Sequence, residues 1–295
     1  KKSAKFNVAV VGATGQVGEA FFDILNERLF PVNEIYPLAS SKSVGKTVTY
    51  GNRNLKICDL SSFDFKNVDI AFFSAGGEVS KKYVPKAALN CVVIDNTSAF
   101  RYETDIPLVV PEVNSSDISQ FKNTNIIANP NCSTIQMVVA LKPIQEEYGI
   151  KRVNVATYQS VSGSGRSGIE ELASQTSNLL NAKEIEKKVY PEQIAFNCIP
   201  QIDRFLDNGY TKEEMKMVWE TKKILGDESI KVNATTVRVP VFFGHSEAVN
   251  VELKKKFKIS DIVVLLEKSP GLIVSGKNEE GQYPTAAVTG ASQDA

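Results

Sequence analysis

The chain has 295 residues, of which 42% are hydrophobic and 23% are charged, as in a globular protein with one large or two medium domains. Its 34 Lys and Arg residues balance 34 Asp and Glu residues, so the basic excess that favours nucleic acid or a membrane surface is missing. The 4 cysteines are scattered, without a CxxC pair or a Cys/His cluster, and indicate neither a disulfide framework nor a metal site.

No apolar run approaches the roughly 20 residues that a membrane-spanning helix needs. The first residues also lack the apolar core of a signal peptide. With dispersed thiols, these features predict a cytoplasmic, reducing location.

Short apolar runs alternate with helix-like segments in the first half of the chain. Buried strands are predicted over residues 6–11, 35–39, 68–73, 92–95 and 125–128, and helices over 17–28 and 79–90. This alternation is typical of an α/β fold with a doubly wound parallel sheet. We therefore predict a Rossmann-type dinucleotide-binding domain over residues 1–131.

The pattern changes after Cys132 and predicts a second, α+β domain over residues 132–295. Its predicted segments are a helix at 133–142, a strand at 152–161, a Gly/Ser-rich turn at 162–168, a polar helical region to about 188, and strands at 235–243 and 247–253. Only three residues, 244–246, join the last two strands. Because a parallel crossover needs a longer connection, we expect these strands to run antiparallel.

Three glycines follow the first predicted strand and open the first predicted helix. Gly12, Gly15 and Gly18, with Thr14, Gln16 and Val17 among them, form a variant of the glycine fingerprint for a dinucleotide. The backbone there would hold the pyrophosphate at the helix N-terminus. The other interpretation is a glycine-rich turn without a ligand.

The second strand ends in Ser40, Ser41 and Lys42 instead of the acidic residue that holds the ribose 2′-hydroxyl of NAD. Two hydroxyls and a lysine suit a 2′-phosphate, so the sequence favours NADP over NAD. A solvated polar loop is the alternative.

Cys132 lies between a predicted strand and a predicted helix, where helix-terminal N–H groups and the helix dipole favour a thiolate and lower the pKa of the thiol. The chain has one histidine, His245, which can serve as a base. A thiolate can add to an aldehyde, and hydride loss from the adduct then leaves an activated thioester. Structural roles for both residues are the alternative, because buried cysteines are common.

Several motifs together resemble the aspartate-β-semialdehyde dehydrogenase family. These motifs are residues 12–18, 96–101, 129–134, 159 with 162–165, 220–223 and 238–245. The resemblance implies NADPH-dependent, reversible reduction of L-4-aspartyl phosphate to L-aspartate 4-semialdehyde, on the route to lysine, methionine, threonine and diaminopimelate. It also implies a homodimer built on the second domain, with a small-molecule substrate and no metal.

The resemblance also assigns roles by position. Cys132 corresponds to the nucleophile, His245 to the acid/base, and Gln159 to the amide that orients the acyl group. Arg238 corresponds to the residue that binds the substrate carboxylate, and Glu220 to the residue that binds its ammonium group. Lys223 and Arg101 correspond to the pair that binds its phosphate group. Ser162 and Gly163 fall among the expected cofactor contacts. Each substrate charge thus meets an opposite partner.

Two other functions are considered. N-acetyl-γ-glutamyl-phosphate reductase performs the same chemistry on a longer acid, but its motif has Gly before and Tyr after the cysteine, where this chain has Asn131 and Ser133. A glyceraldehyde-3-phosphate dehydrogenase differs further around the cysteine. A non-catalytic NADP-binding redox sensor would need the glycines but not Cys132. We also expect that a C-terminal segment of the family, which completes the cofactor domain, is missing here.

Overall fold

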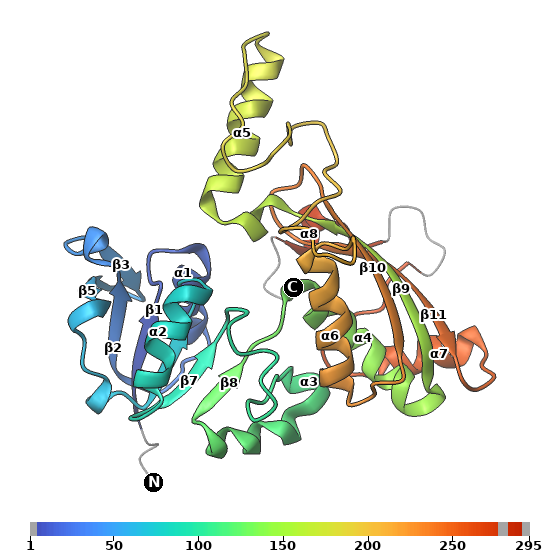
Figure 1. Ribbon diagram of the computed structural model, residues 1–295, viewed down its shortest axis with the longest axis horizontal. Coiled ribbons are helices and arrows are strands. Elements are labelled where there is room, and N and C mark those ends of the chain that lie inside the picture. The colour runs from blue at the N-terminus through green and yellow to red at the C-terminus, as the bar shows by residue number, and fades with distance from the viewer. Residues whose placement is uncertain (1–4, 277–282, 291–295) are drawn as a thin grey trace. The chain divides into compact units, whose positions relative to one another are not determined.

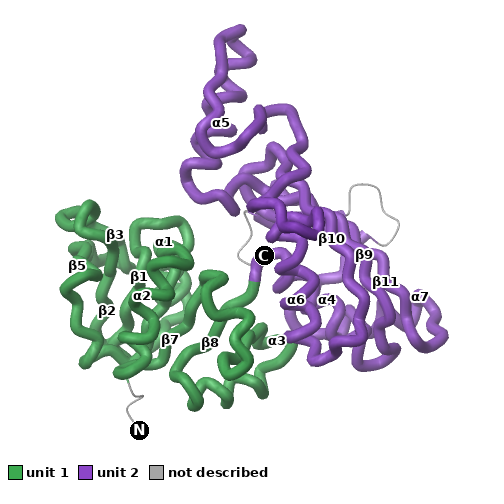
Figure 2. Tube along the Cα trace, in the orientation of Figure 1, with its two compact units in different colours: residues 1–130 green, residues 131–295 purple. Residues whose placement is uncertain are grey.

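The protein is described by a computed structural model that covers residues 5–276 and 283–290 (Figure 1). The chain divides into two compact units, residues 1–130 and 131–295 (Figure 2). The predicted domain boundary, between residues 131 and 132, lies one residue from this division. Residues 291–295, after which we expected a further family segment, lie outside the described part of the chain.

The first unit contains a six-stranded sheet in the order β5-β2-β1-β6-β7-β8. Every neighbouring pair in this sheet is parallel, which confirms the predicted doubly wound arrangement. The strands are β1 (Phe6–Val11), β2 (Val32–Ala39), β5 (Cys58–Asp59), β6 (Ile70–Phe73), β7 (Val92–Asp95) and β8 (Ile126–Ala128).

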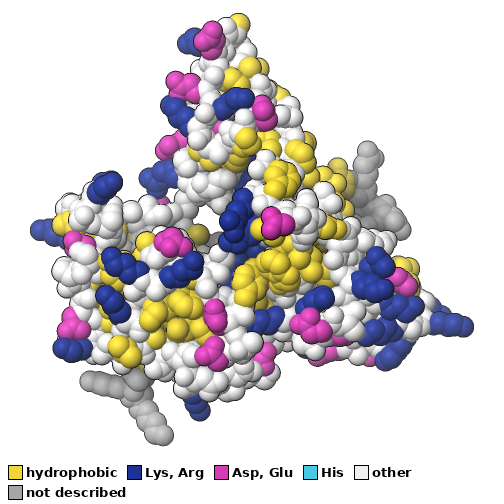
Figure 3. Space-filling view, in the orientation of Figure 1, with side chains coloured by type: hydrophobic (Ala, Val, Ile, Leu, Met, Phe, Trp, Pro, Cys, Tyr) yellow, Lys and Arg dark blue, Asp and Glu magenta, His cyan; other side chains and the backbone are white. Residues whose placement is uncertain are grey.

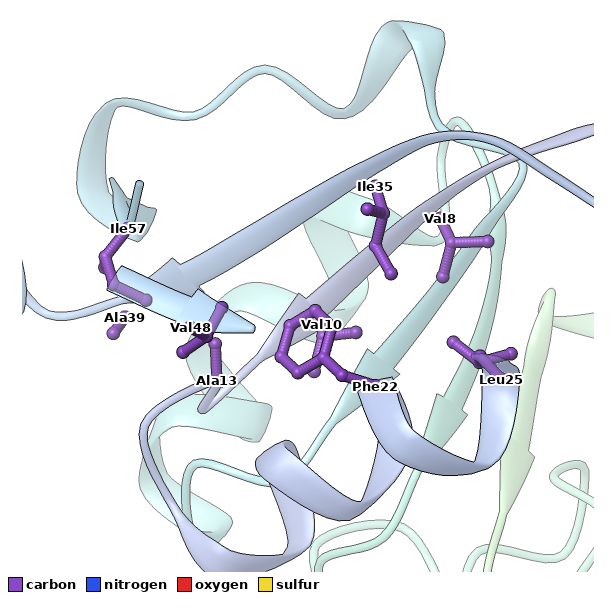
Figure 4. Packing of buried hydrophobic residues seen from close by; sticks show 9 residues of the cluster. All are labelled: Val8, Val10, Ala13, Phe22, Leu25, Ile35, Ala39, Val48 and Ile57. Atoms are coloured by element: carbon purple, nitrogen blue, oxygen red, sulfur yellow. The ribbon is translucent and has the colours of Figure 1, made fainter. Parts of the chain in front are cut away.

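The helices of the first unit follow its strands as in βαβ units. They are α1 (Gln16–Glu27), α2 (Gly77–Ala87) and the short α3 (Pro111–Asn114). Phe22 and Leu25 on one face of α1 belong to the same buried cluster as Val8 and Val10 of β1 (Figure 4). A hairpin of β3 (Thr47–Tyr50) and β4 (Arg53–Lys56), which the sequence did not predict, adds to this cluster. This packing fixes the start of α1, where the glycine turn lies.

The second unit is built on a three-stranded mixed sheet in the order β10-β9-β11. The strands are β9 (Ile150–Gln159), β10 (Lys231–Arg238) and β11 (Ser246–Leu253). β10 is parallel and β11 antiparallel to β9. The opposite directions predicted for β10 and β11 are therefore confirmed, but the two strands are not neighbours, because β9 lies between them. The predicted strand at 235–243 also ends earlier, at Arg238.

The helices of the second unit are α4 (Cys132–Tyr148), α5 (Arg166–Leu180), α6 (Lys212–Leu225), α7 (Ile259–Glu267) and α8 (Ala286–Thr289). Met137 and Leu141 of α4, Met217 of α6, and Ile150 and Val153 of β9 share one buried cluster. This core holds the start of α4 and the buried face of α6 against the sheet. α5 extends away from the sheet (Figure 1).

Basic and acidic side chains both occur on the visible faces of the two units (Figure 3). Across residues 5–276 and 283–290, no helix is long and apolar enough to cross a membrane. Within the same ranges, no group of His, Cys, Asp and Glu side chains is arranged to hold a metal ion.

Candidate active site

Cys132 is the first residue of α4, and the residue before it caps this helix. The side-chain Oδ1 of Asn131 accepts hydrogen bonds from the N–H groups of Ser133 (3.1 Å) and Thr134 (3.4 Å). The predicted position of Cys132 at a helix N-terminus is confirmed. The cap fixes the backbone there, so the thiol leaves the helix in a defined direction.

The predicted lowering of the Cys132 pKa is not what the structure shows. The side chain is exposed to solvent on one side, but protein atoms crowd the thiol on the others. This burial and the negative charge of Glu213 raise the pKa of Cys132, while the Ser133 N–H and the Arg238 guanidinium lower it. The helix terminus acts in the predicted direction, but desolvation and a carboxylate outweigh it. The free protein therefore holds a thiol and not a thiolate.

The ends of two neighbouring strands place Gln159 and Arg238 side by side. The two residues are paired in the register of β9 and β10, and both are buried. One guanidinium nitrogen of Arg238 (Nη1) donates to the carbonyl oxygen of Ser160 at 2.6 Å. The remaining guanidinium donors provide a forked group suited to a carboxylate.

His245 lies just before β11, and its Nδ1 atom faces Ser160. The Ser160 backbone N–H donates to Nδ1 at 3.0 Å, and the Ser160 hydroxyl lies 3.1 Å from the same atom. In the neutral ring Nδ1 is thus the acceptor and Nε2 carries the proton. Burial, together with the positive charge of Arg238, lowers the pKa of His245 to about 4, so the ring is neutral at neutral pH.

Three residues are predicted to bind the ammonium or phosphate group of the substrate. Glu220 and Lys223 lie on α6, and Arg101 lies in the first unit. Glu220 is completely buried, and its Oε2 accepts a hydrogen bond from the Asn131 N–H at 2.6 Å. Glu220 therefore supports the residue before the nucleophile. Lys223 is half-buried near the end of the same helix. Arg101, in the first unit, donates through Nε to the carbonyl of Asn129 at 2.9 Å. The predicted substrate contacts of all three stay predictions.

Ser162 and Gly163, predicted as cofactor contacts, lie beside Arg238 in the second unit. The Ser162 hydroxyl is 2.8 Å from that of Ser160. A Cβ atom on Gly163 would come within 2.8 Å of Arg238 Nη1. Glycine at this position therefore leaves room for the guanidinium, and a contact with the cofactor stays a prediction.

One residue that the sequence interpretation missed connects these parts. Glu213, on the buried face of α6, accepts hydrogen bonds from Asn131 Nδ2 (2.9 Å) and Gln159 Nε2 (3.2 Å). A sequence signal existed: Thr211 and Glu214 form a capping box that starts a helix. The buried positions 213, 214, 217, 220, 221 and 224 of that helix then place three glutamates inside the protein.

The glycine turn of the first unit lines a cavity of about 540 Å³. Five of the predicted cofactor residues line it, namely Gly12, Thr14, Gly15, Ser40 and Ser41. Gln16, Val17 and Lys42 adjoin these residues in sequence but are not among those that line the cavity. The sequence interpretation missed several others, including Asp59, Ser61 and Tyr83.

The turn around this cavity has room only for glycine at two positions. Gly12 has a φ of +91°, and a Cβ there would come within 2.7 Å of the Ser74 carbonyl oxygen. A Cβ on Gly18 would lie 2.1 Å from the Gly12 carbonyl oxygen. The start of α1 thus approaches the turn closely. The N–H groups of a helix start are the groups that bind a pyrophosphate in such turns.

Comparison with known proteins gives consistent matches along the chain. The model "Semialdehyde dehydrogenase, NAD binding domain" matches residues 7–121, and "Semialdehyde dehydrogenase, dimerisation domain" matches residues 141–294. These matches support a nicotinamide cofactor and a homodimer.

Individual relatives agree with these models. The aspartate-semialdehyde dehydrogenase of Legionella pneumophila is 59% identical over 293 residues, which cover 99% of this chain and 84% of the relative. The crystal structure of aspartate semialdehyde dehydrogenase II from Vibrio cholerae, complexed with ASA, has 55% identity and a TM-score of 0.90, with 95% of this chain and 86% of that one covered. The Candida albicans enzyme with NADP has 27% identity and a TM-score of 0.69, with coverages of 90% and 76%.

Proposed function

Since this chain belongs to the aspartate-semialdehyde dehydrogenase family, we propose that it interconverts L-4-aspartyl phosphate and L-aspartate 4-semialdehyde with NADP, through a thioester on Cys132. The observation that carries this proposal is the position of Cys132 at a capped helix start. The charges of Glu213 and Arg238 act on both Cys132 and His245, so the two residues have the same charged neighbours. We further propose that the reaction serves the biosynthesis of lysine, methionine, threonine and diaminopimelate, and that the protein acts in the cytoplasm.

The first unit fits a nicotinamide dinucleotide. The close packing at Gly12 and Gly18 leaves backbone N–H groups at the start of α1 for a pyrophosphate. Ser40 and Ser41 line the same cavity and support a 2′-phosphate, whereas the carboxylate of Asp59, which also lines it, opposes one. Asp59 Oδ1 is engaged by the Ser61 N–H at 2.9 Å. When bound, the nicotinamide exchanges a hydride with the substrate carbon.

Cys132 would attack the acyl carbon of L-4-aspartyl phosphate, and the thioester would form as the bond to the phosphate group breaks. Because the pKa of its thiol is raised in the free protein, the sulfur starts protonated, and its proton would leave with the departing phosphate. The substrate carboxylate would pair with Arg238, whose planar fork suits it better than a lysine. The Gln159 amide would hold the acyl oxygen, since its own orientation is fixed by hydrogen bonds on both sides.

His245 would move the proton at its Nε2 atom. Its Nδ1 accepts from Ser160, so the neutral ring presents an Nε2–H donor to the oxygen of the thiohemiacetal. In the oxidative direction, Nε2 would have to accept a proton from that oxygen, so the neutral ring would first need its own proton on Nδ1, where the Ser160 hydroxyl can accept it. The ring then becomes an imidazolium, whereas the contact with the Ser160 backbone N–H favours the Nε2–H tautomer of the other direction.

The function is tested by NADPH formation from L-aspartate 4-semialdehyde, with and without inorganic phosphate. We expect turnover that depends on phosphate, because phosphate releases the acyl group from the thioester. A protein that binds NADP but forms no NADPH with either mixture would contradict the proposal. N-acetylglutamate semialdehyde would then test the longer-acid reductase, and inactivity with both would favour the sensor.

The preference for NADP is tested by the dissociation constants of NADP and NAD. Tighter binding of NADP is expected, and the Lys42→Glu variant should lose part of that preference because a negative charge is added beside Ser41. Lys122→Glu, an exposed change elsewhere in the first unit, is the matched control. Equal affinities for the two cofactors would contradict the preference.

A further inference from the structure

Glu213 is a buried carboxylate at the centre of the second unit's polar network. Only 5% of the residue is exposed, and α6 presents it toward the start of α4 and the end of β9. Its Oε1 accepts from Asn131 Nδ2 at 2.9 Å and from Gln159 Nε2 at 3.2 Å. Its Oε2 accepts from Lys216 Nζ at 2.9 Å. One carboxylate therefore holds the helix cap next to the nucleophile and the predicted catalytic amide.

These contacts fix the orientation of both amides. Asn131 directs its Oδ1 to the helix N–H groups and its Nδ2 to Glu213. Gln159 receives the Thr157 hydroxyl at Oε1 (3.1 Å) and donates from Nε2 to Glu213. An amide that flipped would place a carbonyl oxygen against a carboxylate, which is unfavourable in a buried site. One Nε2–H of Gln159 remains for the substrate.

Glu213 remains ionised because its charge is balanced. Burial opposes ionisation, but the positive charge of Lys216 and the hydrogen bonds hold the pKa of Glu213 below its usual range. Lys216 itself also bridges to Asp203 at 3.0 Å. The negative charge acts in turn on its neighbours, since it raises the pKa of both Cys132 and His245.

We propose that Glu213 is a positioning residue of the reaction, which orients the Asn131 cap beside Cys132 and the Gln159 amide. Its kinetic role rests on the function proposed above, whereas its effect on the thiol does not. Glu213 acts through Asn131 and Gln159.

The first test measures the alkylation of individual cysteines by iodoacetamide as a function of pH, with peptide mass spectrometry as the readout. In Glu213→Gln, the pH midpoint for Cys132 should fall by roughly half a unit or more, because a nearby negative charge is removed. Cys198 is exposed and serves as an internal reference whose midpoint should not change. Glu146→Gln, which removes an exposed charge at the other end of α4, is the matched control.

The second test measures kcat and KM with L-aspartate 4-semialdehyde, phosphate and NADP. In Glu213→Gln we expect kcat to fall about tenfold, which corresponds to about 1.4 kcal/mol. The KM for NADP should stay at the wild-type value, since Glu213 and the cofactor cavity lie in different units. An unchanged Cys132 midpoint would overturn the effect on the thiol, and an unchanged kcat would overturn the positioning role.

Glu213→Asp covers the case in which Glu213→Gln does not fold, as judged by circular dichroism. The shorter side chain keeps the charge but cannot reach both amides and Lys216. We expect a wild-type Cys132 midpoint with a lowered kcat, and a wild-type kcat would overturn the proposal. If the wild-type protein does not turn over the semialdehyde at all, the proposed function fails, but the alkylation profiles still decide the role of Glu213.

Discussion

At the scale of single residues, the thiol of Cys132 is under opposing influences. The Ser133 N–H and Arg238 stabilise its thiolate, whereas burial and Glu213 stabilise its thiol. The second pair of effects is larger in the free protein, so the pKa of the thiol is raised. A protonated sulfur reacts slowly with oxidants and electrophiles.

Arg238 is predicted to bind the substrate carboxylate by its planar fork. Arg238→Lys keeps the positive charge but loses the paired donors. We expect the KM for L-aspartate 4-semialdehyde to rise about tenfold or more, in line with the loss of one charge-assisted hydrogen bond. The KM for NADP should not change. Steady-state kinetics with each substrate varied in turn provides the measurement, and a semialdehyde KM within error of wild type would remove Arg238 from the substrate site.

Glu247, in β11, is predicted to make stability depend on pH. Its Oε1 is buried and has no hydrogen-bond partner among the residues that the structure describes. Burial raises the pKa of its carboxyl from 4.5 to about 8, although a hydrogen bond with Gln136 lowers it. The unfolded chain releases this proton near pH 4.5, whereas the folded protein keeps it to about pH 8. The protonated carboxyl thus makes its full contribution to the free energy of unfolding below pH 4.5, and this contribution is lost as the pH rises to about 8.

The measurement compares urea unfolding of wild type and Glu247→Gln. Between pH 5 and pH 8, the wild type should lose on the order of 3 kcal/mol relative to the variant, because glutamine does not ionise. Well below pH 4.5 the two profiles should run parallel, because the carboxyl is then protonated in both the folded and the unfolded protein. Parallel profiles between pH 5 and pH 8 would contradict a Glu247 carboxyl that folding keeps neutral.

Residue identity in the sequence was sufficient for some of these sites and not for others. The position of Cys132 at a helix start followed from the strand before it and the apolar run after it. The sign of its pKa shift did not, because burial and Glu213 come from elements distant in sequence. Glu213 itself stands among Lys212, Glu214 and Lys216, a charged run that is usually solvated.

At the scale of elements, α6 organises the site because it supplies both Glu213 and Glu220. Its start is fixed by a capping box, in which Thr211 Oγ1 accepts from the Glu214 N–H at 3.3 Å and Glu214 Oε2 accepts from the Thr211 N–H at 2.7 Å. Glu214 Oε1 also accepts from the Thr236 N–H of β10. The cap therefore joins α6 to the strand that carries Arg238.

Removal of this cap is predicted to weaken both the fold and the reaction. Thr211→Ala should lower the free energy of unfolding by about 1 kcal/mol, as for other N-cap substitutions. It should also lower kcat, because Glu213 lies in the first turn of the helix. Thr211→Ser keeps the hydroxyl and is the matched control. Chemical denaturation and steady-state assays provide the two readouts, and equal values for the alanine and serine variants would argue against this function of the cap.

Elements with a strong local pattern were predictable, and those defined by pairing were not. The apolar runs of β1, β6 and β7 alternate along the chain with segments whose apolar residues have helical spacing. This alternation indicated the parallel sheet. The insertion of β9 between β10 and β11 depends on contacts between segments about 80 residues or more apart in register, such as Gln159 with Arg238. The short connection at 244–246 correctly predicted that β10 and β11 run in opposite directions. It carried no information about which strand lies between these two.

At the scale of the whole molecule, the predicted cofactor turn and the predicted catalytic residues lie in different units. The glycine turn and its cavity lie within the first unit, and Cys132, Gln159, Arg238 and His245 lie within the second. Cofactor binding should therefore survive changes to the nucleophile. In Cys132→Ser we expect the dissociation constant of NADP to match wild type while turnover is nearly abolished, because a hydroxyl is a far weaker nucleophile near neutral pH.

Isothermal titration with NADP and the spectrophotometric assay measure these two properties on the same preparation. Retained NADP binding without turnover supports an enzyme whose cofactor unit works independently. Wild-type turnover in Cys132→Ser would contradict the cysteine mechanism. A loss of NADP binding would contradict the separation of the two sites.

The central claim is that Cys132 carries the acyl group of aspartate, and peptide mass spectrometry tests it most directly. The protein is incubated with L-aspartate 4-semialdehyde and NADP without phosphate, quenched in acid and digested. The account predicts a mass increase of one aspartyl group on the peptide that contains Cys132, its loss on addition of phosphate, and no such adduct in Cys132→Ser. NADPH formation without any adduct on Cys132, or an adduct on another residue, would contradict it.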